Sequence, residues 1–168
     1  MGALLGLTAA FTSGVTALVP AAHADDDFGV ALNGVYRVMS DGDWAKGNEV
    51  KYKQQTVIET WTVTTDCVSP IECTGTVVSD RGWTATARLD DYWVIDHDIP
   101  NWVPCPDGTF APGHQKFMVM GWNRQTELRD THETNFLVGR NVTKSPSGAC
   151  GVNKPVVIEM PVWMEKIG

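Results

Sequence analysis

The sequence contains no stretch with a sustained 3.6-residue apolar period, so helices are not expected to build the fold. Only Gln125–Glu133 could form a single helical turn. A glycine-rich phosphate loop, a G-x-S-x-G nucleophile elbow and an EF-hand loop are also missing. No pair of cysteines has the C-x2-C spacing of zinc sites. These absences argue against the common nucleotide-binding, hydrolase and metal-binding classes, and we assign no catalytic residue, metal ligand or cofactor.

Residues 1–24 lack Lys, Arg, Asp and Glu altogether and end in the small-x-small sequence Ala22-His23-Ala24. The acidic run Asp25-Asp26-Asp27 follows directly. This pattern predicts a signal peptide at 1–24 and a single β-rich secreted domain at 25–168. An uncleaved membrane anchor fits less well with the Thr, Ser, Gly and Pro content of the leader. The product is therefore expected in the cell envelope or outside the cell, with no stable membrane anchor after cleavage.

Basic residues are too few and too scattered to form a cluster, and the formal net charge is −7. The longest basic pattern is Lys51-Tyr52-Lys53, which is typical of a solvated strand edge. An acidic surface repels phosphate backbones and anionic lipid headgroups, so nucleic acid is not an expected partner.

The chain has only four cysteines, and in an exported protein an even number implies disulfides. We favour two pairs among the three possible connectivities, Cys67–Cys73 and Cys105–Cys150. The first pair brackets the short turn segment "VSPIE". The second would close a long loop, worth about 4 kcal/mol on the chain-entropy model.

Short β-rich runs separated by turn residues fill the chain from Gly34 onward. This pattern predicts an all-β fold, and sequential turns of modest length favour a small antiparallel β-barrel over the alternative, a two-sheet β-sandwich. The expected strands are Gly34–Met39, Thr56–Thr65, Thr74–Ser79, Trp83–Leu89, Trp93–Asp98, Lys116–Trp122, Thr134–Arg140 and Val156–Met164. Because Pro161 removes a ladder donor, the last strand is expected at an edge or bulged.

The segment "DYWVIDHDIPNW" places His97 between Asp96 and Asp98. On a strand the two aspartates share one face and His97 takes the other, so the three cannot hold one ion. A three-residue hairpin loop, Asp90–Tyr92, buries fewer carboxylates than a two-residue loop and turns His97 inward. The simplest role of this imidazole is a hydrogen bond to a backbone carbonyl near the sheet end; the functional alternative is a contact in a ligand cavity.

Three further residues are candidates for ligand binding. Glu59 shares strand parity with Trp61 and is buried and partnered if that row faces inward. Trp44, in "SDGDWAKGN", is a candidate exposed aromatic, or else plugs one end of the barrel. Trp93 could hold a small apolar ligand. Its expected companions are Trp61, Met118 and Met120.

The chain resembles the small exported proteins of unknown function found in mycobacteria and related actinobacteria. The features that carry the resemblance are the leader ending at Ala24, "NGVYRVMSDGDWAKGN", "TWTVTTDC", the close Cys67/Cys73 pair, "NWVPCPDGT" and "GACGVNKPVVIEMP". The resemblance implies an exported, disulfide-bonded, β-rich domain of the cell envelope or culture fluid, and it implies no reaction, cofactor or active-site residue.

The leading hypothesis is a non-enzymatic binding or interaction module, monomeric, whose partner is an unknown protein or a small apolar ligand. Rigid scaffolds of this kind usually carry recognition on loops or in a cavity. The alternative is an envelope hydrolase acting on glycan or lipid around His97. It would draw on Asp96, Glu59 or His132, and it requires these groups to meet in one pocket.

Overall fold

The computed structural model describes residues 28–168, so the expected signal peptide at 1–24 lies outside the described residues. The regular elements of the described part are strands and two 3-10 turns. They are β1 (Gly34–Ser40), η1 (Gly42–Trp44), β2 (Lys46–Gly47), β3 (Val50–Lys51), β4 (Val57–Ser69), β5 (Glu72–Ser79), β6 (Thr84–Asp90), β7 (Tyr92–Pro104), β8 (Phe110–Asn123), β9 (Leu128–Arg129), β10 (Phe136–Lys144), η2 (Ala149–Gly151) and β11 (Val157–Lys166). Between residues 28 and 168, no helix has the length and apolar character needed to cross a membrane.

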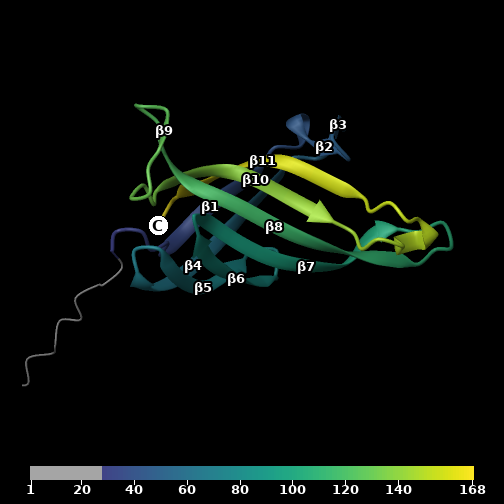
Figure 1. The fold of residues 1–168 in the computed structure, drawn as a ribbon, viewed down its shortest axis with the longest axis horizontal. Coiled ribbons are helices and arrows are strands. Elements are labelled where there is room, and N and C mark those ends of the chain that lie inside the picture. The colour runs from purple at the N-terminus through teal and green to yellow at the C-terminus, as the bar shows by residue number, and fades with distance from the viewer. Residues whose placement is uncertain (1–27) are drawn as a thin grey trace, which may run out of the picture.

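Eight strands form a closed antiparallel barrel in the order β1-β4-β5-β6-β7-β8-β10-β11, and β11 pairs back with β1 (Figure 1). The expected β-barrel is therefore confirmed, and the sandwich is not formed. Each expected strand corresponds to one barrel strand. The short β2–β3 hairpin extends the sheet beside β11, and β9 pairs only with β8.

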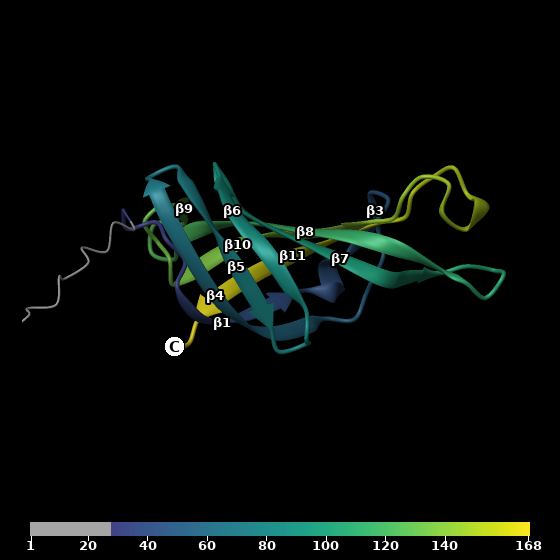
Figure 2. The ribbon, with the colours of Figure 1, turned by 90° about the horizontal axis from the view of Figure 1, so that it is seen from below.

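Two segments project from one end of the barrel (Figure 2). One is the β7–β8 hairpin, whose strands are 13 and 14 residues long, and the other is the β10–β11 connection, which contains η2. The disulfide Cys105–Cys150 joins them, and Cys67–Cys73 closes the β4–β5 turn at the opposite end. Both expected disulfides are thus confirmed.

The β6–β7 register is that of the three-residue loop, with Leu89 opposite Trp93 and Ala87 opposite Ile95. Asp91 occupies the left-handed region at φ 61°, which an aspartate tolerates better than most residues. This register sets the inward row of β7 as Trp93, Ile95 and His97. As a result, Trp93 lies near one end of the barrel interior and His97 near the other.

Two local expectations are wrong. The strand carrying Pro161 is not an edge, because β11 pairs with β10 on one side and with β1 and β2 on the other, and no register shift marks a bulge. Pro161 lies where the β1 ladder ends, and its carbonyl accepts a hydrogen bond from the Asp41 amide at 2.8 Å. Residues Gln125–Glu133 form turns and the short strand β9 in place of a helical turn.

The middle of the barrel is filled by apolar side chains, and Trp61 lies at its centre. The Trp61 ring meets those of Trp83 and Phe117 edge-on, at centroid distances of 5.3 and 4.7 Å. The other fully buried apolar side chains include Tyr36, Val63, Val77, Ile95, Val119, Leu137 and Met164. Within the barrel formed by residues 28–168, the solid middle confines the interior cavities to the two ends.

Because of Tyr36, the free energy of unfolding is expected to decrease at alkaline pH. Burial raises the pKa of its phenol to about 12, while its hydroxyl donates to the Thr134 carbonyl at 3.0 Å. An unfolded tyrosine loses its proton near pH 10, so raising the pH from 8 to 11 favours unfolding by about 1.4 kcal/mol through this group. Denaturant titrations at both pH values should show that loss in the wild type and not in Tyr36→Phe. Equal pH dependence in the two proteins would contradict the assignment.

Candidate functional site

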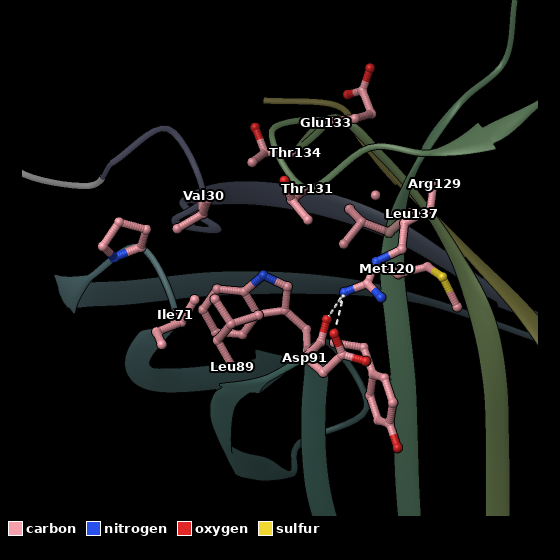
Figure 3. Close-up of a pocket in the computed structure, with 14 residues that line it drawn as sticks. Val30, Ile71, Leu89, Asp91, Met120, Arg129, Thr131, Glu133, Thr134 and Leu137 are labelled. Atoms are coloured by element: carbon pink, nitrogen blue, oxygen red, sulfur yellow. Dashed lines mark hydrogen bonds and ion pairs between the residues drawn. The ribbon is translucent and has the colours of Figure 1, made fainter. Parts of the chain in front are cut away.

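An apolar pocket of about 120 Å³ opens at the end of the barrel where the β4–β5 and β6–β7 turns lie. We call it the mouth pocket. It is lined by Val30, Pro70, Ile71, Leu89, Asp91, Tyr92, Trp93, Met120, Gly121, Arg129, Thr131, Glu133, Thr134 and Leu137. Figure 3 shows Val30 and Ile71 on one side of the pocket and Met120 and Arg129 on the other. The buried Trp93 contributes the largest apolar side chain to its lining.

One wall of the mouth pocket is the segment that precedes β1. Val30 and Leu32 are buried where this segment crosses the barrel end. The Leu32 amide donates to Thr65 Oγ1 at 2.9 Å, and the Thr65 amide donates to Asn33 Oδ1 at 2.8 Å. These bonds fix the segment against β4, so Val30 is held in a defined place at the edge of the pocket.

The opposite wall is the connection between β9 and β10, and Gly121 allows it to come close. A Cβ atom at Gly121 would lie 2.2 Å from the carbonyl oxygens of both Asp130 and Glu133. The Asp130 amide donates to the Gly121 carbonyl at 3.0 Å. Only a glycine on β8 permits this contact, so the connection folds over the barrel end and brings Thr131 and Thr134 to the pocket.

An ion pair borders the mouth pocket. The Arg129 guanidinium donates to the Asp91 carboxylate at 2.9 Å and also to the backbone carbonyl of Asp91 (Figure 3). Both side chains are substantially exposed. Such pairs contribute at most about 1 kcal/mol, so Arg129 can exchange Asp91 for another anion or acceptor at little cost.

The other end of the barrel interior is polar. Nδ1 of His97 lies 3.2 Å from Oε1 of Gln115, the Gln115 amide donates to Asn141 at 3.1 Å, and the Asn141 amide donates to Ser40 at 3.1 Å. A cavity of about 30 Å³ lies beside these hydrogen-bonded side chains and can hold one or two water molecules. Glu59 also lines this cavity.

His97 faces inward as expected, but its hydrogen-bond partner differs from the one predicted. The imidazole is half-buried, and its partner is the side chain of Gln115, not a backbone carbonyl. Because Oε1 of the amide only accepts, Nδ1 of His97 carries the hydrogen. The ring stacks on Trp83 at a centroid distance of 4.3 Å.

Glu59 also faces inward, and one of its carboxylate oxygens accepts two hydrogen bonds. Its Oε2 accepts from the Trp61 indole at 2.7 Å and from the Ser79 hydroxyl at 3.1 Å. The two donors account for a carboxylate at the edge of an apolar core. Glu59 and His97 thus belong to the same polar end of the interior, and Trp93 lies at the other end.

Asp96 and Asp98 lie on the outer face of β7, away from His97, and meet a different histidine. His114 on β8 contacts Asp98 at 2.7 Å and Asp96 at 3.2 Å. Burial raises the pKa of Asp96, but the Arg88 hydrogen bond and the nearby Lys116 and Arg88 charges outweigh it, so the pKa lies below its ordinary value. Across residues 28–168, no group of three or more His, Cys, Asp or Glu side chains is placed to hold a metal ion.

Trp44 lies on the outside of the barrel in η1 and is 66% exposed, so it does not plug the barrel end. The Lys51 ammonium lies 5.0 Å from the centroid of its ring. Of the residues expected beside Trp93, Met120 also lines the mouth pocket. Trp61 is buried in the core, and Met118 does not line the pocket.

His97 and His132 do not meet. His97 is opposite Gln115 on β8, whereas His132 lies between Asp130 and Glu133, which pack on Gly121. Gln115 and Gly121 are six residues apart along β8, so the two histidines lie about 20 Å from each other along the strand. The composite site required by the hydrolase hypothesis is therefore not assembled from these two histidines.

The fold and the site define a class: a closed eight-stranded antiparallel barrel with two disulfides, a solid middle, a polar end and one apolar mouth. No protein-family model matches the chain, and no curated protein matches its sequence. Among solved structures, the chain is similar to the monomer form of the Mycobacterium tuberculosis PknI sensor domain. The TM-score is 0.58 at 16% identity, over 82% of this chain and 88% of that one. At this identity the likeness shows a shared fold.

Proposed function

We propose that this protein is a non-enzymatic, exported binding module that takes a small apolar ligand, or the apolar end of a larger one, into the mouth pocket. The observation that carries the proposal is the pocket itself. Its wall is mainly apolar, with Leu89, Trp93 and Leu137 inside and Arg129 at the border. Concave apolar sites with a few convergent polar groups are the usual form of small-molecule sites.

The volume limits what can enter. An apolar cavity of about 150 Å³ binds benzene, so a pocket of about 120 Å³ suits a short alkyl chain or a small ring. The Arg129 guanidinium and the Thr131 and Thr134 side chains stand where a hydroxyl or carboxylate on the ligand would emerge. The expected ligand class is therefore an amphipathic molecule whose apolar end, a short alkyl segment or a small ring, enters the pocket, as the end of a medium-chain alcohol or acid would.

Two further observations support export and sensing. Disulfides persist in oxidising compartments, and both pairs of cysteines are bonded. The solved structure that shares the fold is described as a sensor domain in its monomer form. These points agree with a monomeric domain outside the cytoplasm and with the resemblance to small exported actinobacterial proteins.

Titration of the protein with octanol and octanoate, followed by amide chemical shifts, tests the proposal. Saturable shifts are expected at Trp93, Gly121 and Leu137 for both probes. The variant Leu89→Trp fills the pocket and should weaken binding at least tenfold. The matched control Leu128→Trp places the same ring on exposed β9, outside the pocket, and should bind as the wild type does.

Shifts confined to other parts of the barrel, or equal binding by Leu89→Trp and the wild type, would contradict the proposal. The hydrolase alternative gains no support from the geometry. The contacts of His97 are the Gln115 amide and the Trp83 ring, neither of which can act as an acid–base partner.

A further inference from the structure

The β4–β5 turn carries two of the most exposed aliphatic side chains of the described residues. Val68 is 75% exposed and Ile71 is 81% exposed. They flank Pro70 at the tip of a hairpin that Cys67–Cys73 closes. A crosslinked tip loses little conformational freedom when it meets a partner, and exposing two large aliphatic groups in water costs free energy that a partner would recover.

The same end of the molecule presents two more exposed apolar side chains from separate parts of the chain. Phe28 precedes the segment that forms one pocket wall, and Leu128 precedes Arg129 on β9. In Figure 1 the start of the described chain, the β9 hairpin and the β4–β5 turn all lie at the left end of the barrel. The apolar groups are thus separate protrusions around the mouth pocket, and they do not form a flat patch.

The β4–β5 hairpin carries no positive charge. No Lys or Arg occurs between Lys53 and Arg81, whereas Asp66 and Glu72 flank the tip. Because this hairpin is acidic and the chain carries a net charge of −7, an anionic surface would repel the hairpin tip even though Arg129 borders the pocket. Protruding aliphatic groups with a few acidic neighbours match a surface that has an apolar interior and uncharged or zwitterionic headgroups.

We propose that the mouth end docks on a neutral lipid surface, with Val68 and Ile71 inserted below the headgroups, and that the ligand passes from that surface into the mouth pocket. The inference rests on the proposed function, because it supplies the source of the apolar ligand. Its geometric basis is that Ile71 both protrudes from the tip and lines the pocket. A ligand leaving the lipid beside Ile71 enters the site of Trp93 without crossing water.

A lipid surface fits these observations better than a protein partner. Protein interfaces bring together a continuous surface of about 800 Å² per partner. Here the apolar groups stand apart on separate turns, which suits a fluid surface that closes around each one. The strength of binding to a lipid interface increases with the apolar area that the inserted side chains bury.

Flotation of the mature protein, residues 25–168 after removal of the expected signal peptide, with vesicles tests the proposal. The protein should float with phosphatidylcholine vesicles and less with vesicles containing phosphatidylglycerol. Val68→Asp and Ile71→Asp should each reduce the bound-to-free ratio at least tenfold, because each replaces an inserted aliphatic group by a charge. The matched control Val78→Asp makes the same change on the outer face of β5, at the other end of the barrel, and should float as the wild type does.

The octanol titration and the flotation experiment together distinguish the binding function from the lipid-docking proposal. Octanol binding without flotation of the wild type would overturn the docking surface and leave the binding function intact. Flotation without octanol binding would overturn the function and, with it, the transfer of a ligand. Flotation only with phosphatidylglycerol, or equal loss in Val78→Asp, would show that charge and not the mouth tip drives adsorption and would overturn the inference. Circular dichroism of each variant checks that it is folded.

Discussion

Replacing Trp61 by alanine is expected to lower the free energy of unfolding by about 3–5 kcal/mol. The side chain is fully buried at the centre of the barrel, where its ring meets Trp83 and Phe117 edge-on. Its removal leaves a cavity that neighbouring strands of a closed barrel cannot collapse to fill. The change also takes from Glu59 one of its two hydrogen-bond donors, which adds the cost of a poorly solvated carboxylate.

The substitution Trp61→Phe is an intermediate change. It keeps one aromatic ring in the core but removes the indole N–H together with part of the ring volume, so we expect a loss of about 1–3 kcal/mol. Equilibrium denaturation in guanidinium, monitored by far-ultraviolet circular dichroism, gives both values. A loss below about 1 kcal/mol for Trp61→Ala would contradict the central packing role of this residue.

Removal of the Cys105–Cys150 disulfide is expected to cost up to about 4 kcal/mol, and removal of Cys67–Cys73 about 2 kcal/mol. The first bond spans a sequence separation of 45 and the second a separation of only 6. A longer closed loop restricts the unfolded chain more. The two double Cys→Ser variants serve as controls for each other, because each removes one bond and leaves the other in place.

Unfolding of both variants under non-reducing conditions measures this difference. Equal losses, or a larger loss from Cys67–Cys73, would show that the two bonds do not act mainly through the unfolded chain. The variant lacking Cys105–Cys150 should keep the mouth pocket, since the bond joins the projecting segments at the opposite end of the barrel.

Most of the fold follows from local patterns in the sequence. Strand alternation in "DYWVIDHD" separates His97 from Asp96 and Asp98, and the burial of fewer carboxylates predicts the correct β6–β7 register. The placement of His97 and Glu59 on the inner face and Asp96 on the outer face follows from the same parity. Strand alternation is local, so one sequence suffices to establish it.

The partners of these residues and the mouth pocket depend on contacts between distant segments. His97 meets Gln115, and Arg129 meets Asp91, through strand pairings that no local pattern specifies. Val30 and Leu137 reach the pocket only because the barrel closes. The predicted Asp90–Tyr92 turn lies at the pocket and could have indicated one side of it. The helical interpretation of Gln125–Glu133 gave no indication that Arg129 borders the pocket.

Pro161 shows why a local rule failed on β11. A proline lacks the amide needed by an internal strand, and from sequence alone this indicates an edge. In the closed barrel its position coincides with the end of the β1 ladder, so no donor is missed. The exception depends on how far the neighbouring strand extends, which is a property of the whole fold.

The most direct test of the binding function is a set of intermolecular nuclear Overhauser effects from octanol to the protein. The account predicts contacts from the octanol chain to the Trp93 ring and to the methyl groups of Leu89 and Leu137, with the hydroxyl end toward Arg129. These contacts should disappear in Leu89→Trp. Contacts of octanol only with outer residues such as Trp44, or none at saturating octanol, would contradict it.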